Sequence, residues 1–173
     1  MCLRVIKINA LNKNSEALNL IDELIIDNPK NLALVLNRAL LTDKAFKAEK
    51  NQLDSAAQIK EIETLIQLYQ EVLTLSPRNP LANFNLAVVY SEKANFFVKE
   101  INRMGPGLSI AQQENSQKAS KSALLDATRY MEVAKATQPA NMNILNALRL
   151  FYDKLGLSEK KDAIDLEIQA LKN

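Results

Sequence analysis

The sequence contains no histidine and no tryptophan, and it has one cysteine and three glycines. Histidine is the commonest general base and a common metal ligand, so its absence excludes Ser-His and Cys-His nucleophile arrangements and most zinc sites. The single thiol, Cys2, excludes an intramolecular disulfide, and without a histidine partner we do not expect it to act as a nucleophile. We therefore expect no catalytic residue, no metal site and no cofactor, and hence no enzyme.

The remaining candidates for catalysis are weak. The glycine-rich stretch at 105–107 lacks a following Lys-Ser or Lys-Thr and follows no predicted strand, so it does not make a phosphate-binding loop. Two pairs of carboxylates lie among lysines on predicted helices, Glu61 with Glu63 and Asp162 with Asp165. We interpret both pairs as solvated helix faces and not as acid-base pairs.

An excess of charge of one sign is also lacking. The 22 basic and 20 acidic residues leave a net charge of +2, too weak a field to attract nucleic acid. No uncharged apolar run approaches the roughly 20 residues that cross a bilayer, so we expect a soluble chain without membrane insertion. Residues 1–11 contain Arg4 and Lys7 and do not form a signal-peptide core. The sequence does not determine the location, which we take as cytoplasmic by default for the chain as given, or as exported or periplasmic if the amino end was trimmed.

What the sequence does contain favours helices. Apolar residues make up 47% of the chain, and Leu, Ala, Ile, Asn, Lys and Glu dominate. Three prolines, Pro29, Pro77 and Pro139, each follow a helical pattern and precede a new one, where a residue without an N–H cannot continue a helix. Each is predicted to mark a corner between helices of an all-α protein.

Apolar residues recur at fixed distances before these three prolines. The positions twelve, eight and five residues before them hold Ala17, Ile21, Leu24, Leu65, Tyr69, Val72, Ala127, Met131 and Ala134. Steps of four and then three residues place each trio on one stripe of a helix. The pattern predicts the same packing face three times.

A second pattern follows the prolines at nine, ten and thirteen residues. These positions hold Leu86, Ala87 and Tyr90, then Leu148, Arg149 and Tyr152, and, in a degenerate copy, Arg38, Ala39 and Thr42. The two patterns together resemble the tetratricopeptide repeat (TPR) family, most closely over 80–90 and 127–139, with Met131 in the usual aromatic place. The resemblance covers most of the chain and implies a TPR-like stack of antiparallel helical hairpins, an α-α superhelix of about three to four hairpins.

The spacing of the prolines departs from the family's usual period of about 34 residues. The spacings here are 48 and 62 residues. When the excess over that period is shared between the two helices of a hairpin, each helix gains about two turns in the first case and about four in the second. Elongated hairpins would keep their packing faces aligned. The segment at 151–160 also resembles the end of repeat proteins in exported bacterial assemblies.

These patterns predict eight helices, at 2–11, 15–27, 31–49, 55–75, 80–103, 111–137, 141–155 and 158–172. They belong to a single domain, 1–173, with hairpins at about 2–27, 31–75, 80–137 and 141–172. Because the chain starts a few residues inside a repeat, it is either a fragment or begins with an atypical capping helix. We interpret 111–125 as a solvated arm.

The family resemblance implies a function in protein binding. In TPR proteins the first helices of the hairpins line a concave surface that takes extended or helical peptides. The matching residues are Leu81, Phe84, Asn85, Val88, Asn143, Asn146 and Leu150. Only the asparagines fit the Lys, Arg and Asn clamp that one branch uses for a C-terminal carboxylate, so we do not expect such a clamp. These asparagines, together with Asn83, can hydrogen-bond a peptide backbone.

Leu81, Phe84 and Val88 make the helix at 80–103 apolar on a second side. Either a neighbouring hairpin covers this stripe or it is an open groove for a partner. We therefore predict a non-catalytic adaptor that binds a partner peptide or helix on the concave face. The alternative is a structural subunit that uses the same apolar faces to form a homodimer or a larger assembly.

Overall fold

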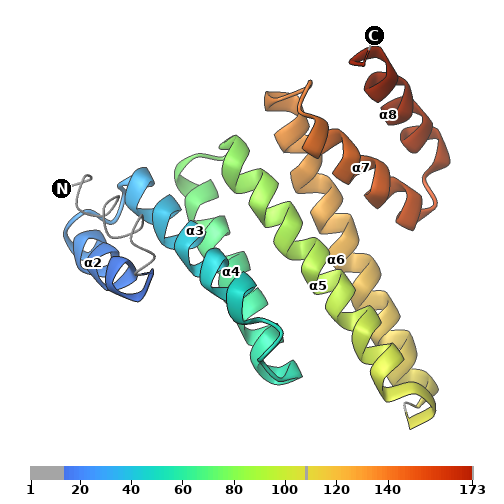
Figure 1. Cartoon of the computed structure of the whole chain (residues 1–173), viewed down its shortest axis with the longest axis horizontal. Helices are drawn as coiled ribbons and strands as arrows, with labels where there is room; N and C mark the ends of the chain where they lie inside the picture. The colour runs from blue at the N-terminus through green and yellow to red at the C-terminus, as the bar shows by residue number, and fades with distance from the viewer. Residues whose placement is uncertain (1–13, 108, 173) are drawn as a thin grey trace. The chain divides into compact units, whose positions relative to one another are not determined.

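The computed structural model describes residues 14–107 and 109–172, which form seven α-helices and one short 3-10 turn and include no strand (Figure 1). The elements are α2 (Asn14–Asp27), α3 (Leu32–Glu49), α4 (Ser55–Leu75), α5 (Pro80–Met104), η1 (Gly105–Gly107), α6 (Ile110–Thr137), α7 (Met142–Leu155) and α8 (Ser158–Ala170). The predicted all-α fold is confirmed, and the predicted ends of these helices agree to within two residues. The helix predicted at 2–11 lies outside the described residues.

Polar side chains start most of these helices. Asn31, Asp54, Asn79 and Asn141 each accept a hydrogen bond from a backbone N–H in the first turn of α3, α4, α5 or α7. Ser109 opens α6 with a reciprocal capping box that includes Gln112. Such caps satisfy N–H groups that have no partner within the helix, which is why short polar residues stand at these corners.

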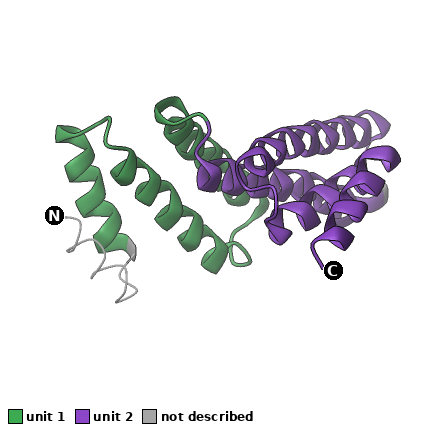
Figure 2. Cartoon of the chain, turned by 90° about the horizontal axis from the view of Figure 1, so that it is seen from above, with its two compact units in different colours: residues 1–77 green, residues 78–173 purple. Residues whose placement is uncertain are grey.

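The chain divides into two compact units, one ending at Pro77 and the other beginning at Arg78 (Figure 2). In the first unit α2 packs on α3 and α3 packs on α4. Part of its core is the cluster Ala17, Ile21, Leu24 and Leu41, between α2 and α3. The single domain expected from the sequence stays a prediction.

In the second unit α5 and α6 form a long antiparallel hairpin, α7 packs on α6, and α8 packs on α7. The lengths of these helices differ widely, with 25 and 28 residues in α5 and α6 but only 14 and 13 in α7 and α8. At 1.5 Å per residue, α5 is about 16 Å longer than α7. The joined end of α5 and α6 therefore extends past α7 (Figure 1).

The packing stripes predicted from the prolines are buried. None of the nine residues that precede the prolines is more than 9% exposed. In the second pattern Leu86, Ala87 and Leu148 are fully buried, and Tyr152 is 5% exposed. The exceptions are polar residues: Arg149, which is exposed with its guanidinium 3.6 Å from the carboxylate of Asp165, and Arg38 and Thr42 of the degenerate copy, which are only half-buried. None of the described helices combines the length and the hydropathy that a membrane span requires.

Candidate partner-binding face

The residues predicted for the concave face lie on α5 and α7 of the second unit. On α5, Leu81 is 45% exposed, and the remaining three, Phe84, Asn85 and Val88, are half-buried. On α7, Leu150 is 49% exposed, and Asn143 and Asn146 are exposed. Both sets follow helical spacing, so each forms a stripe along its own helix.

A small hollow joins the beginnings of these two helices. Its volume is about 200 Å³, and it is lined by Pro80, Leu81, Phe84, Gln138, Asn141 and Asn143. The hollow thus brings Leu81 and Phe84 together with Asn143, whereas the other four predicted residues do not line it. Asn141 belongs to the corner itself, since its Oδ1 caps α7 and its Nδ2 donates to Gln138 Oε1 at 2.8 Å.

The prediction that Asn83 binds a peptide is wrong. Its side chain is 1% exposed, and its Nδ2 donates to the backbone carbonyl of Asn79 at 2.9 Å. Asn83 lies three and four residues before Leu86 and Ala87, on the buried stripe of α5. The spacing of Asn83 from these two apolar residues already indicated that its side chain is buried.

The carboxylates weighed as acid-base candidates include one well-defined ion pair. Lys161 Nζ lies 2.9 Å from Asp165 Oδ2, and this hydrogen bond, with the nearby Arg149, lowers the pKa of Asp165 below its usual value. The same bond raises the pKa of Lys161. Both shifts favour the charged forms, so the pair does not supply an acid or a base near neutral pH. Within the described ranges, no group of three or more Cys, Asp or Glu side chains is arranged to hold a metal ion.

A buried polar cluster in the first unit was missed at the sequence level. Asp43 on α3 is 5% exposed, and its Oδ2 accepts hydrogen bonds from Lys47 Nζ at 2.8 Å and from the Tyr69 hydroxyl at 3.1 Å. Burial of Tyr69, followed by the charge and the hydrogen bond of Asp43, raises the pKa of this tyrosine. We interpret the cluster as structural, because it links α3 to α4.

A larger groove was also missed. It has a volume of about 490 Å³ and is lined by Ala94, Asn95, Val98, Ile101, Gln117, Ser120, Lys121, Leu124, Lys154 and Leu155. The prediction that 111–125 is a solvated arm is therefore wrong at its end, where Leu124 is only 7% exposed. The apolar spacing of Ala94, Val98 and Ile101, four and then three residues apart, predicts an apolar stripe on α5 but not the groove, which also needs α6 and α7.

Comparisons with known proteins bear on the fold. No protein-family model matches the chain, and no curated protein does. Among solved structures, one described as MamA MSR-1 C2 is similar over 97% of this chain and 72% of its own, with 14% identity and a TM-score of 0.57. The MamA structure is TPR-like, so the similarity shows that the described helices of this chain form a TPR-like fold. A crystal structure of MamA matches 96% of this chain and 92% of its own, with 15% identity and a TM-score of 0.46.

The TPR-like likeness confirms the stack of antiparallel hairpins expected from the proline-marked patterns. At 14% identity it concerns the fold alone.

Proposed function

We propose that this chain is a non-catalytic protein-interaction module, which binds a peptide or helix of a partner protein on the face that α5 and α7 form at their beginnings. The observation that carries the proposal is the hollow at this corner, where the partly exposed Leu81 and Phe84 lie beside Asn143. Exposed apolar side chains that gather at a hollow are typical of interaction sites.

The character of the hollow favours a peptide over a cofactor or a carboxylate. About 200 Å³ lies below the 300–1,000 Å³ that is usual for small-molecule pockets, so the hollow suits a side chain that anchors a larger partner. Its polar residues are Gln138, Asn141 and Asn143, which are amides without charge. Amides can hydrogen-bond a peptide backbone, but they do not provide the cations that hold a carboxylate.

The second candidate function is self-assembly through the same face. Leu81 on α5 and Leu150 on α7 are both about half exposed, and one apolar patch on each copy is sufficient for a two-fold symmetric contact. In that case the chain is a structural subunit. The two functions differ in what covers the face in solution.

The experiment compares the chain with its Leu81→Glu/Leu150→Glu variant. Light scattering over a range of concentrations measures self-association, and chemical crosslinking with quantitative mass spectrometry compares the proteins that each form captures. Leu166→Glu on α8, at a residue 67% exposed, is the matched control for an added charge.

A monomeric wild type that captures proteins lost by the double variant, but kept by the control, supports the interaction module. A wild-type dimer that the double variant alone converts into monomers supports self-assembly instead. If the double variant matches the wild type in both measurements, this face has neither function. Far-UV circular dichroism checks that all three proteins are equally helical.

A further inference from the structure

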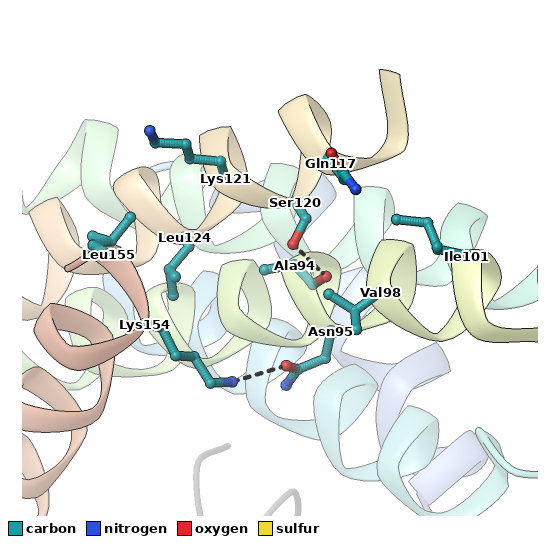
Figure 3. A pocket seen from close by; sticks show the side chains of 10 residues that line it. All are labelled: Ala94, Asn95, Val98, Ile101, Gln117, Ser120, Lys121, Leu124, Lys154 and Leu155. Atoms are coloured by element: carbon teal, nitrogen blue, oxygen red, sulfur yellow. Dashed lines mark hydrogen bonds between the residues drawn. The ribbon is translucent and has the colours of Figure 1, made fainter. Parts of the chain in front are cut away.

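The 490 Å³ groove lies where the long hairpin continues past the end of α7. Its floor and walls come from the second half of α5, the first half of α6 and the last turn of α7 (Figure 3). We call it the ledge groove. None of its lining residues belongs to the face proposed above, so the inference below does not rest on that function.

The floor of the ledge groove is apolar. Val98 is 46% exposed, whereas Ala94 and Leu124 are buried at 4% and 7%. The one hydroxyl in the floor is turned to the backbone, because Ser120 Oγ donates to the carbonyl of Ala94 at 3.0 Å (Figure 3). An apolar surface of this kind gains free energy when a partner removes it from water.

The rim of the ledge groove is positively charged. Lys154 Nζ donates to Asn95 Oδ1 at 3.2 Å, and this neutral amide carries no charge that would compensate the ammonium (Figure 3). Lys121 has no ion-pair partner within the described ranges, and no carboxylate lines the groove.

The surrounding segment has the same sign of charge. Residues 95–121 carry four Lys or Arg and two Glu, and the pair of Arg103 with Glu100 at 2.8 Å leaves three basic residues and one acidic residue. The complementary partner surface is therefore acidic.

We infer that the ledge groove is the docking site for an acidic amphipathic helix of a partner protein. α5 and α6 present side chains in rows four residues apart, the surface into which the ridges of a third helix pack. α7 already packs on α6 and ends beside the groove. From Asn95 to Met104, α5 extends by about 15 Å, which accommodates a helix of about ten residues or three turns.

The sequence pattern of the docked helix follows from the groove. Apolar residues at i, i+3 or i+4, and i+7 cover Val98, Ile101 and Leu124. Carboxylates on either side of that stripe lie within reach of Lys121 and Lys154. This pattern distinguishes the docked helix from the partner of the α5–α7 face, whose hollow contains no charged residue.

The test uses a fluorescein-labelled helical peptide of about twelve residues, with three leucines at that spacing and glutamates on both flanks. Fluorescence anisotropy with the full chain measures its Kd against that of a peptide in which every glutamate is replaced by lysine. We expect the acidic peptide to bind and the basic one not to bind. Lys121→Glu/Lys154→Glu should weaken the acidic peptide about tenfold and allow the basic peptide to bind.

Two further variants locate the site. Val98→Asp, a change at a half-exposed residue, should abolish binding of the acidic peptide, whereas Ile26→Asp on α2, at a residue 79% exposed, should leave it unchanged. Lys60→Glu on α4 is the control for the loss of a lysine. Leu81→Glu should also leave peptide binding unchanged, which separates failure of this inference from failure of the proposed function.

Three results would overturn the inference. The first is no saturable binding of the acidic peptide up to about 1 mM, the weak limit of specific recognition. The second is equal binding of the acidic and basic peptides, or equal binding by the wild type and the Lys121→Glu/Lys154→Glu variant. The third is a wild-type dimer that Val98→Asp converts into monomers in light scattering, which would assign the ledge groove to a second copy of this chain.

Discussion

At the scale of single residues, Asp43 makes the stability of the first unit sensitive to the loss of a single hydrogen-bond donor. Its Oδ2 has two donors, but its Oδ1 is buried without a hydrogen-bond partner. A buried acceptor that lacks a donor costs free energy, so the carboxylate depends on the donors that remain. One of these is the hydroxyl of Tyr69, a residue that is fully buried.

Tyr69→Phe should lower the free energy of unfolding by about 1–2 kcal/mol, because it removes a donor from a buried carboxylate and leaves the ring in place. Urea denaturation followed by circular dichroism measures the change. Tyr130→Phe is the matched control, since the ring of Tyr130 stacks on Tyr90 and its hydroxyl makes no hydrogen bond with the described residues. A loss as large in the control would contradict this role of Asp43.

The same tyrosine predicts a dependence of stability on alkaline pH. Burial and Asp43 raise the pKa of Tyr69 in the folded chain, while in the unfolded chain it ionises near pH 10. Above that pH the folded state binds more protons than the unfolded state, so the stabilisation is complete below about pH 10 and is lost as the pH rises.

The stability of the wild type relative to Tyr69→Phe should therefore fall above about pH 10, by up to about 1.4 kcal/mol per pH unit. Urea denaturation of both proteins between about pH 8 and pH 11 tests this. The raised pKa of Tyr152, which results from burial and a hydrogen bond to Glu132, affects both proteins alike. Parallel pH profiles would show that Tyr69 keeps an ordinary pKa in the folded chain.

At the scale of elements, the end of α7 decides where the ledge groove opens. Gly156 has a φ of +71°, a left-handed conformation that ends the helix. The backbone N–H of Leu157 then bonds to the carbonyl of Tyr152 at 2.8 Å. A glycine at this position stops α7 next to the groove while α5 and α6 continue.

Gly156→Ala should lower the free energy of unfolding by about 1 kcal/mol, because an L-residue is strained in this conformation. A Cβ at Gly156 would meet no atom within 4 Å, so the cost is conformational and not steric. Gly107→Ala is the control, since a Cβ there also meets nothing and the φ of Gly107 is not positive. Thermal and urea unfolding measure both variants, and equal effects would argue against the role of the left-handed turn.

At the scale of the whole molecule, each of the two compact units has a buried apolar core of its own. Leu65 on α4 lies in the first unit and Met131 on α6 in the second, and both are fully buried. In repeat folds stability is approximately a sum over units and their nearest-neighbour contacts. A cavity therefore lowers the stability mainly of the unit that contains it.

Leu65→Ala should therefore reduce amide hydrogen-exchange protection mainly in α3 and α4, and Met131→Ala mainly in α5 and α6. Each cavity should cost about 2–5 kcal/mol of local stability. Hydrogen exchange with mass spectrometry on the full chain resolves the helices separately. An equal loss of protection over both units in both variants would mean that the chain unfolds as one cooperative body.

The sequence alone determined the helices and the apolar stripes before the prolines that they bury. Prolines, polar caps and apolar steps of three and four residues are local features, and each acts on the turn that contains it. For this reason the nine stripe residues could be predicted and are all buried. The resemblance to the TPR family implied the stripes on α5 and α7, although it did not show that Leu81, Phe84 and Asn143 share one hollow.

The tertiary structure alone decided which surfaces are hollow and which charges meet. The ledge groove exists because α5 and α6 are longer than α7, so it depends on neighbouring elements and not on the pattern within one helix. Likewise Lys154 meets Asn95 from 59 residues away, and Tyr69 meets Asp43 from 26 residues away. Such contacts have no local sequence signal, because they follow from how helices of unequal length pack against one another.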